Sequence, residues 1–211
     1  MVSFITQAVT TRRSTTAVHK YPTIDIEDYL TLDQNSKNAR YEYLDGELRM
    51  LAGGSNYHSA IISRLSGILE RHLENTSCWV YNSDMKFKLS ESCYVYPDVM
   101  VSCDQSDQEP EQTVIHYPSL VIETLSPSTE TTDRGEKLLY YQEYPSIQEY
   151  VMVDSQSIRI EVYHREEDGW KLHTYGPGGT VKLESFDIQF PISTIYRGMR
   201  LTGTRKNTRR K

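Results

Sequence analysis

The segment VIETLSPSTETTDRGEKLLYY, residues 121–141, decides the fold of this chain. It opens on an apolar, β-branched run interrupted by Glu123, which predicts a buried central strand. A Ser/Thr/Asp-rich stretch follows, and Leu138 and Tyr141 then recur at helical spacing until Pro145 ends the helix. The segment therefore predicts a strand that leads directly into a helix, with one carboxylate inside the strand.

Further strand-like runs surround this unit. They lie at residues 79–83, 85–89, 96–103, 149–154, 157–164, 170–175 and 180–185. Residues 41–50 indicate a hairpin around Asp45-Gly46, and residues 56–73 repeat apolar positions every three or four residues, as an amphipathic helix does. Residues 21–30 read as a short helix or extended entry, and residues 104–112 as a surface loop. The order predicts an α+β (α/β) fold, in which one mixed β-sheet is flanked by helices.

The length and composition indicate one globular domain. The chain has 211 residues, 37% of them hydrophobic, and no apolar run approaches the roughly 20 residues of a membrane helix. Its start lacks the apolar core of a secretory signal. We expect a cytoplasmic protein with a flexible segment at residues 1–20, a domain at 21–203 and a disordered basic tail at 204–211.

The charge is distributed unevenly. Eight of the basic residues lie in the first 20 and last seven residues, which contain no acid, so the net charge of −6 leaves −14 for residues 21–204. An acidic body is unfavourable for binding nucleic acid, whose affinity comes largely from neutralised phosphates. Divalent metal ions would offset part of this charge, and the basic tail could tether a polyanion.

The three cysteines, Cys78, Cys93 and Cys103, are odd in number and lack the C-x-x-C spacing of zinc sites. We expect buried, reduced thiols.

Two acids inside apolar runs are the best candidates for chemistry. Asp98 lies in Tyr96-Pro97-Asp98-Val99, and Glu123 lies in the strand described above. A buried carboxylate is costly unless it is paired or binds a metal. Either acid alone could instead accept backbone hydrogen bonds, but the pair favours an Mg²⁺ or Mn²⁺ site that activates water for phosphodiester hydrolysis.

The cation that such chemistry uses is absent from the strand, because Leu125 stands two residues after Glu123. Lys137, on the following helix, is the replacement candidate, although lysines are mostly exposed. His58 could approach phosphate or water, but a structural or exposed histidine is the commoner case. Asp133 and Arg134 are explained as caps of the second helix, where acids suit the helix dipole.

Longer motifs carry a family resemblance across residues 22–200. The chain resembles the Uma-type restriction endonuclease family of the PD-(D/E)XK nuclease superfamily, on the motifs YEYLDGELRM, HSAIISRLSGIL, SDMKFKL, YPDVMV, VIETLSPSTETTDRGEKLLYY and PSIQEYVMVD with IRIEVY. The resemblance implies a nuclease core in which Asp98 and Glu123 bind the metal, with a third acid at Glu42, or less favourably Glu47. It also suggests that the lysine has moved to Lys137.

Two functions follow as hypotheses. The first is an endonuclease that hydrolyses DNA phosphodiester bonds with Mg²⁺ or Mn²⁺, using Asp98, Glu123, Glu42 and Lys137. Nucleases of this fold often dimerise, so a homodimer is compatible with it. The second is a catalytically inactive protein of the same fold that binds or regulates a partner, which the acidic body and the missing strand lysine favour.

Overall fold

The structure is a computed structural model that describes residues 21–51 and 53–201. The segments predicted to be flexible or disordered, residues 1–20 and the basic tail at 204–211, lie outside the described residues. Across the described ranges, no helix has the length and apolar character needed to cross a membrane.

The largest sheet has six strands in the order β11-β10-β9-β8-β6-β3. β8 (Pro118–Leu125) runs parallel to β9 (Glu149–Asp154), while the other neighbours are antiparallel. The chain crosses from β8 to β9 through two short helices, α3 (Glu130–Asp133) and α4 (Glu136–Glu143). The remaining strands are β3 (Trp79–Asn82), β6 (Val99–Ser102), β10 (Ile160–Glu166) and β11 (Gly169–Tyr175).

Two smaller sheets complete the molecule. One has the order β2-β1-β5-β4-β7, and the other pairs β12 with β13. The helix α1 (Ile26–Asn35) packs on the five-stranded sheet. The strands of that sheet are β1 (Tyr41–Leu44), β2 (Glu47–Met50), β4 (Lys86–Ser90), β5 (Cys93–Val95) and β7 (Val114–Ile115). The two-stranded sheet consists of β12 (Thr180–Leu183) and β13 (Ile188–Pro191).

The α+β class with mixed sheets flanked by helices is confirmed, but the expectation of a single sheet is wrong. β5 ends at Val95 and belongs to the five-stranded sheet, whereas β6 begins at Val99 in the six-stranded one. Pro97 lies between them, and its lack of an N–H group prevents it from continuing a hydrogen-bonded ladder. The chain therefore changes sheets one residue before Asp98.

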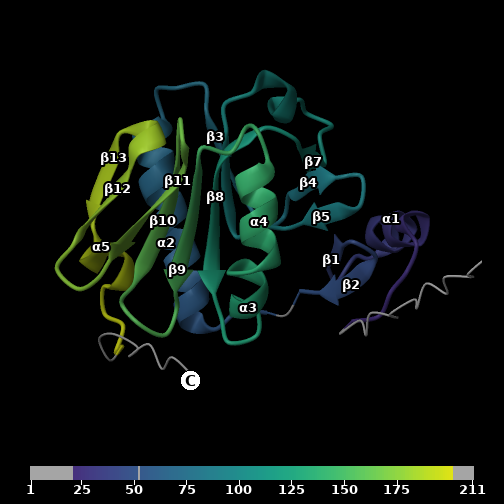
Figure 1. Ribbon diagram of the computed structural model, residues 1–211, viewed down its shortest axis with the longest axis horizontal. Coiled ribbons are helices and arrows are strands. Elements are labelled where there is room, and N and C mark those ends of the chain that lie inside the picture. The colour runs from purple at the N-terminus through teal and green to yellow at the C-terminus, as the bar shows by residue number, and fades with distance from the viewer. Residues whose placement is uncertain (1–20, 52, 202–211) are drawn as a thin grey trace, which may run out of the picture.

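The two faces of the six-stranded sheet are covered by different helices. Figure 1 shows α4 in front of this sheet and α2 (Asn56–Leu73) behind it. Leu120 and Ile122 of β8 pack in the core cluster with α2, while Val121 packs with Tyr141 of α4. Because side chains alternate along a strand, Glu123 shares the face of Val121 and points toward α4.

The structure corrects the prediction for the cysteines. Cys78 and Cys103 form a disulfide, and Cys93 is a free thiol whose pKa is raised by burial to about 12. β3 and β6 pair antiparallel with Trp79 opposite Ser102. The next residues outward, Cys78 and Cys103, therefore lie opposite each other. Sequence spacing does not reveal this cross-strand relation.

Candidate active site

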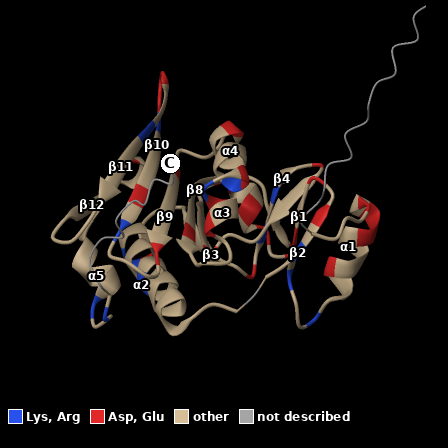
Figure 2. Ribbon diagram, turned by 60° about the horizontal axis from the view of Figure 1, so that its bottom comes forward, with Lys and Arg blue, Asp and Glu red and all other residues tan. Residues whose placement is uncertain are grey.

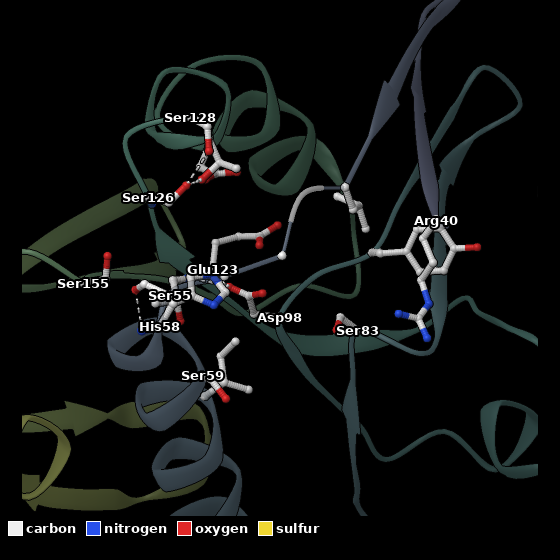
Figure 3. A pocket seen from close by; sticks show the side chains of 18 of the residues that line it. Arg40, Ser55, His58, Ser59, Ser83, Asp98, Glu123, Ser126, Ser128 and Ser155 are labelled. Carbon is white, nitrogen blue, oxygen red and sulfur yellow. Dashed lines mark hydrogen bonds and ion pairs between the residues drawn. The ribbon is translucent and has the colours of Figure 1, made fainter. Parts of the chain in front are cut away.

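Asp98 and Glu123 lie side by side on adjacent strands. Val99 is paired with Ile122, so the residues just beyond them, Asp98 and Glu123, come together at the same end of β6 and β8. Both line a cleft of about 1400 Å³ that also contains Glu42 and Lys137. Figure 3 shows the two carboxylates directed into this cleft, with His58 beside Asp98. The structure thus brings together the four residues singled out from the sequence.

Among the described residues, one oxygen of Asp98 has partners and the other has none. Asp98 Oδ2 accepts a hydrogen bond from the backbone N–H of Thr124 at 2.7 Å, and His58 Nε2 lies 3.3 Å from the same oxygen. Oδ1 has no hydrogen-bond partner among the described residues. The carboxylate is therefore anchored through Oδ2, while Oδ1 remains available.

Glu123 has the same division between its oxygens. Its Oε1 accepts hydrogen bonds from Lys137 Nζ at 3.0 Å and from the Tyr141 hydroxyl at 2.9 Å, and Oε2 has no such partner in the described part of the chain. Burial raises the pKa of Glu123, Lys137 opposes the rise, and the nearby acids, Asp133 first, add to it. This carboxylate holds its proton more tightly than an exposed one.

Lys137 is enclosed by acids. It lies in the first turn of α4, is 4% exposed, and its Nζ is 2.7 Å from Glu42 Oε1, 3.0 Å from Glu123 Oε1 and 3.5 Å from Asp133 Oδ1. Burial lowers its pKa, but the three carboxylates outweigh burial and raise it overall. The ammonium is therefore charged and lies directly beside Glu123.

Glu42, rather than Glu47, reaches this cluster. Glu42 on β1 accepts hydrogen bonds at Oε1 from the Tyr96 backbone N–H at 3.1 Å and from Lys137. Glu47 instead pairs with Arg49 at 2.7 Å. Within residues 21–51 and 53–201, no three His, Cys, Asp or Glu side chains are grouped as a ready-made metal site.

Asp133 is a member of the cluster that the sequence interpretation missed. Its explanation as a helix cap is wrong, because its side chain is buried beside Lys137 and its Oδ1 makes no hydrogen bond with any described residue. Burial raises its pKa, which Lys137 opposes. The four-residue spacing to Lys137 was the available signal, since residues i and i+4 meet on one helical face.

His58 contacts the site rather than solvent. It lies in the first turn of α2, where Ser55 Oγ accepts its backbone N–H at 3.3 Å, and the imidazole reaches Asp98. Burial lowers the pKa of His58, but Asp98, the Thr124 backbone and Asp133 together outweigh burial, so the pKa is raised. The imidazole and the Asp98 carboxylate form an ion pair when the ring is protonated.

Most other charges near the cleft are paired. Arg40 pairs with Asp84, and Arg49 pairs with Glu47 and Glu136. Acidic segments, red in Figure 2, cover α1 and the α3–α4 region. The site is thus a negatively charged pocket with Lys137 at its centre.

Lys86 on β4 is paired with an acid of α1. Its Nζ is 2.5 Å from Asp33 Oδ2, and its side chain is largely buried. Lys88, on the same strand, pairs with Glu91 at 2.6 Å.

The mixed sheet, its flanking helices and the paired acids over a cleft define a protein of the nuclease-like class. A solved structure from Anabaena variabilis ATCC 29413, described as "a putative nuclease belonging to DUF820", matches 82% of this chain and 97% of its own with a TM-score of 0.70. Its sequence identity of 18% supports the shared fold alone.

The chain belongs to the Uma2 family, described as "Putative restriction endonuclease", whose model matches residues 26–193. It is 39% identical to the Synechocystis protein "Uncharacterized protein slr1290", over 85% of this chain and 94% of that protein. A second Synechocystis protein, "Uncharacterized protein sll1609", is 30% identical over 74% and 89% of the two chains. The family and the fold together support a nuclease-like function.

Proposed function

We propose that this protein is a divalent-metal-dependent endonuclease that hydrolyses DNA phosphodiester bonds, with Asp98 and Glu123 as its metal-binding pair. One observation carries the proposal. Each carboxylate has one oxygen held by protein donors, and its other oxygen has no partner among the described residues. Held carboxylates with free oxygens are what an ion site requires, because the donors fix the orientation of each ligand.

The donor set suits Mg²⁺ or Mn²⁺. Mg²⁺ prefers oxygen ligands and is commonly bound by one or two carboxylates together with waters and substrate phosphates. Two protein ligands are therefore enough, and Glu42 is the third candidate because its Oε2 is also without a partner in the described ranges. Three acids around one lysine leave an excess of negative charge, which a divalent cation would offset.

A divalent ion at this pair would polarise a phosphate oxygen and lower the pKa of a bound water. Lys137 contributes a fixed positive charge beside the same carboxylate, which offsets negative charge that develops on the attacked phosphate. Tyr141 donates to the oxygen that Lys137 also contacts. Glu123 is therefore held in its orientation by two donors from α4.

Lys137 on α4 supplies the positive charge that the strand β8 lacks at Leu125. Leu125, two residues after Glu123, is buried in the core cluster that contains Tyr141. A lysine there would have to place its charge among apolar side chains, which is costly. The helix supplies the cation instead, and Glu42 and Glu123 hold it.

Plasmid nicking tests the proposal. Purified protein with Mn²⁺ should convert supercoiled DNA to nicked circles, EDTA should stop the reaction, and an RNA substrate run in parallel tests the preference for DNA. Asp98→Asn and Glu123→Gln should abolish cleavage. Asp84→Asn is the matched control, because Asp84 lines the same cleft but is exposed and pairs with Arg40. Cleavage that persists in both site variants would refute the assignment.

A catalytically inactive binding or regulatory protein is the second candidate, and the engagement of Lys137 favours it. Two hydrogen bonds to carboxylates already occupy the ammonium, as they would in a purely structural ion cluster. Calorimetry separates the two functions. A wild-type protein that takes up no Mn²⁺ at millimolar concentration and leaves DNA and RNA intact would support the second candidate.

A further inference from the structure

His58 contacts the carboxylate proposed to bind metal, from a helix that contributes no acid to the site. Its Nε2 lies 3.3 Å from Asp98 Oδ2, the oxygen that also accepts the Thr124 backbone N–H at 2.7 Å. The His58 side chain is 17% exposed, so water has limited access to this contact. Two donors from different elements thus converge on one oxygen.

The loop before α2 is shaped around the imidazole. A Cβ atom added at Gly54 would lie 2.4 Å from His58 Nδ1 and 2.8 Å from its Cγ, so any larger residue would displace the ring. Gly53 differs, because an added Cβ there meets nothing within 4 Å. Ser55 caps the helix and fixes the first turn that carries His58. Such a fit is unexpected for an incidental surface histidine.

We propose that His58 is a positioning residue that holds Asp98 by Oδ2 and thereby presents Oδ1 to a divalent cation. The inference rests on the proposed function, in which Asp98 is a metal ligand. Groups that hydrogen-bond a metal ligand fix its orientation, and their loss typically weakens metal affinity about 10- to 100-fold. In this role His58 touches neither the ion nor the phosphate.

Metal affinity measures this role without reference to catalysis. We expect His58→Leu to weaken Mn²⁺ binding about 10-fold, the lower end of that range, because the Thr124 N–H still holds Oδ2. His58→Gln should stay within about threefold of wild type, since its side-chain amide can donate to the same oxygen. Isothermal titration calorimetry on the full chain gives these affinities. Ser59→Ala, an exposed position on the same helix, is the control.

The glycine pair tests the same contact without changing the histidine. Gly54→Ala should weaken Mn²⁺ binding toward the level of His58→Leu, because the new methyl group displaces the ring, whereas Gly53→Ala should bind as wild type does. Ser55→Ala removes the cap and costs about 1 kcal/mol of stability. Fraying of this turn should weaken Mn²⁺ affinity less than Gly54→Ala does, because the ring itself is not displaced.

A readout that needs no metal separates this inference from the proposed function. The amide proton of Thr124, which donates to Asp98 Oδ2, should change its chemical shift in the NMR spectrum of His58→Leu and of Gly54→Ala, but not of Gly53→Ala. Asp98→Asn provides the reference for loss of the carboxylate. Absence of Mn²⁺ binding in the wild type would overturn the proposed function, while this resonance would still report on His58. An unchanged Thr124 resonance in both His58→Leu and Gly54→Ala would overturn the positioning role.

Discussion

Two aspartates away from the cleft, Asp107 and Asp154, use their oxygens differently from Asp98 and Glu123. Asp107 gives Oδ1 to the backbone N–H of His116 and Oδ2 to Ser102 and Tyr117. Asp154 accepts hydrogen bonds at both oxygens from residues two and three positions further on. Asp98 and Glu123, in contrast, each keep one oxygen without a partner among the described residues.

A free oxygen alone does not mark a site acid, because Glu149 is fully buried and its Oε2 also lacks a partner among the described residues. Asp98 and Glu123 combine a free oxygen with a place in the wall of the cleft, which Glu149 does not line. Asp107 and Asp154 are saturated by donors from nearby loops, as buried polar groups normally are. Glu123 takes its donors from α4, and Asp98 takes one from α2, so tertiary packing holds both while leaving an oxygen exposed to the cleft.

Removing the Lys137 ammonium should have the largest effect on stability. Lys137→Met should lower the free energy of unfolding by about 3–5 kcal/mol, because it leaves buried carboxylates without their charge partner. Chemical denaturation without metal measures the loss, and a second change, Glu42→Gln, should recover part of it. Lys88→Met is the control, since its pair with the exposed Glu91 should contribute at most about 1 kcal/mol. A Lys137→Met protein as stable as wild type would contradict the charge cluster.

Removing a site acid should affect activity more than stability. Asp98→Asn and Glu123→Gln should each reduce the cleavage rate at least about 100-fold, which corresponds to roughly 2.7 kcal/mol of transition-state stabilisation. Their melting temperatures should not fall, because each change removes repulsion between acids. Initial rates per mole of folded protein, followed with a labelled DNA substrate, give the comparison. A lowered melting temperature with an unchanged rate would place these acids in the structural class.

A structural acid should show the opposite behaviour. Asp107→Asn should cost about 1–3 kcal/mol of stability, because the new amide N–H₂ would face existing donors and leave one of them unpaired. Urea unfolding measures this cost. Cleavage by the folded variant should equal that of wild type. A loss of cleavage without a loss of stability would show that Asp107 is not a purely structural acid.

The smallest effect concerns pH. The folded-state pKa of Glu123 is raised above its usual 4.5, so the folded protein binds this proton more tightly than the unfolded chain does. The stability from this group is complete below about pH 4.5 and is lost as the pH rises through the raised value, with a slope of at most about 1.4 kcal/mol per pH unit. Unfolding measured in EDTA at several pH values should show this decline.

Glu123→Gln should flatten that decline, and so should saturating Mn²⁺, because the metal takes the place of the proton. A decline that is the same in wild type and Glu123→Gln would assign the proton to another group.

Much of the fold could be predicted because its signals are local. The hairpin at residues 41–50, the helix at 56–73 and the strand entering the α3–α4 region follow from short-range periodicity and turn residues, and the structure contains all three. β5, β13 and the short helix α5 (Ile192–Tyr196) were not predicted, because three to five residues are too few to show a period. The division into separate sheets was missed for a related reason, since strand pairing joins residues far apart in the chain.

The sequence by itself determined the candidate pair Asp98 and Glu123, because a carboxylate inside an apolar run is recognisable from its neighbours alone. It also pointed to Lys137, because Leu125 stands where the strand would otherwise carry a lysine. Only the tertiary structure decided which acids surround the lysine, because it adds Asp133 to the cluster and pairs Glu47 with Arg49 instead. It alone placed His58 against Asp98. These outcomes depend on hydrogen bonds between residues tens of positions apart, and such contacts are set by packing rather than by local propensity.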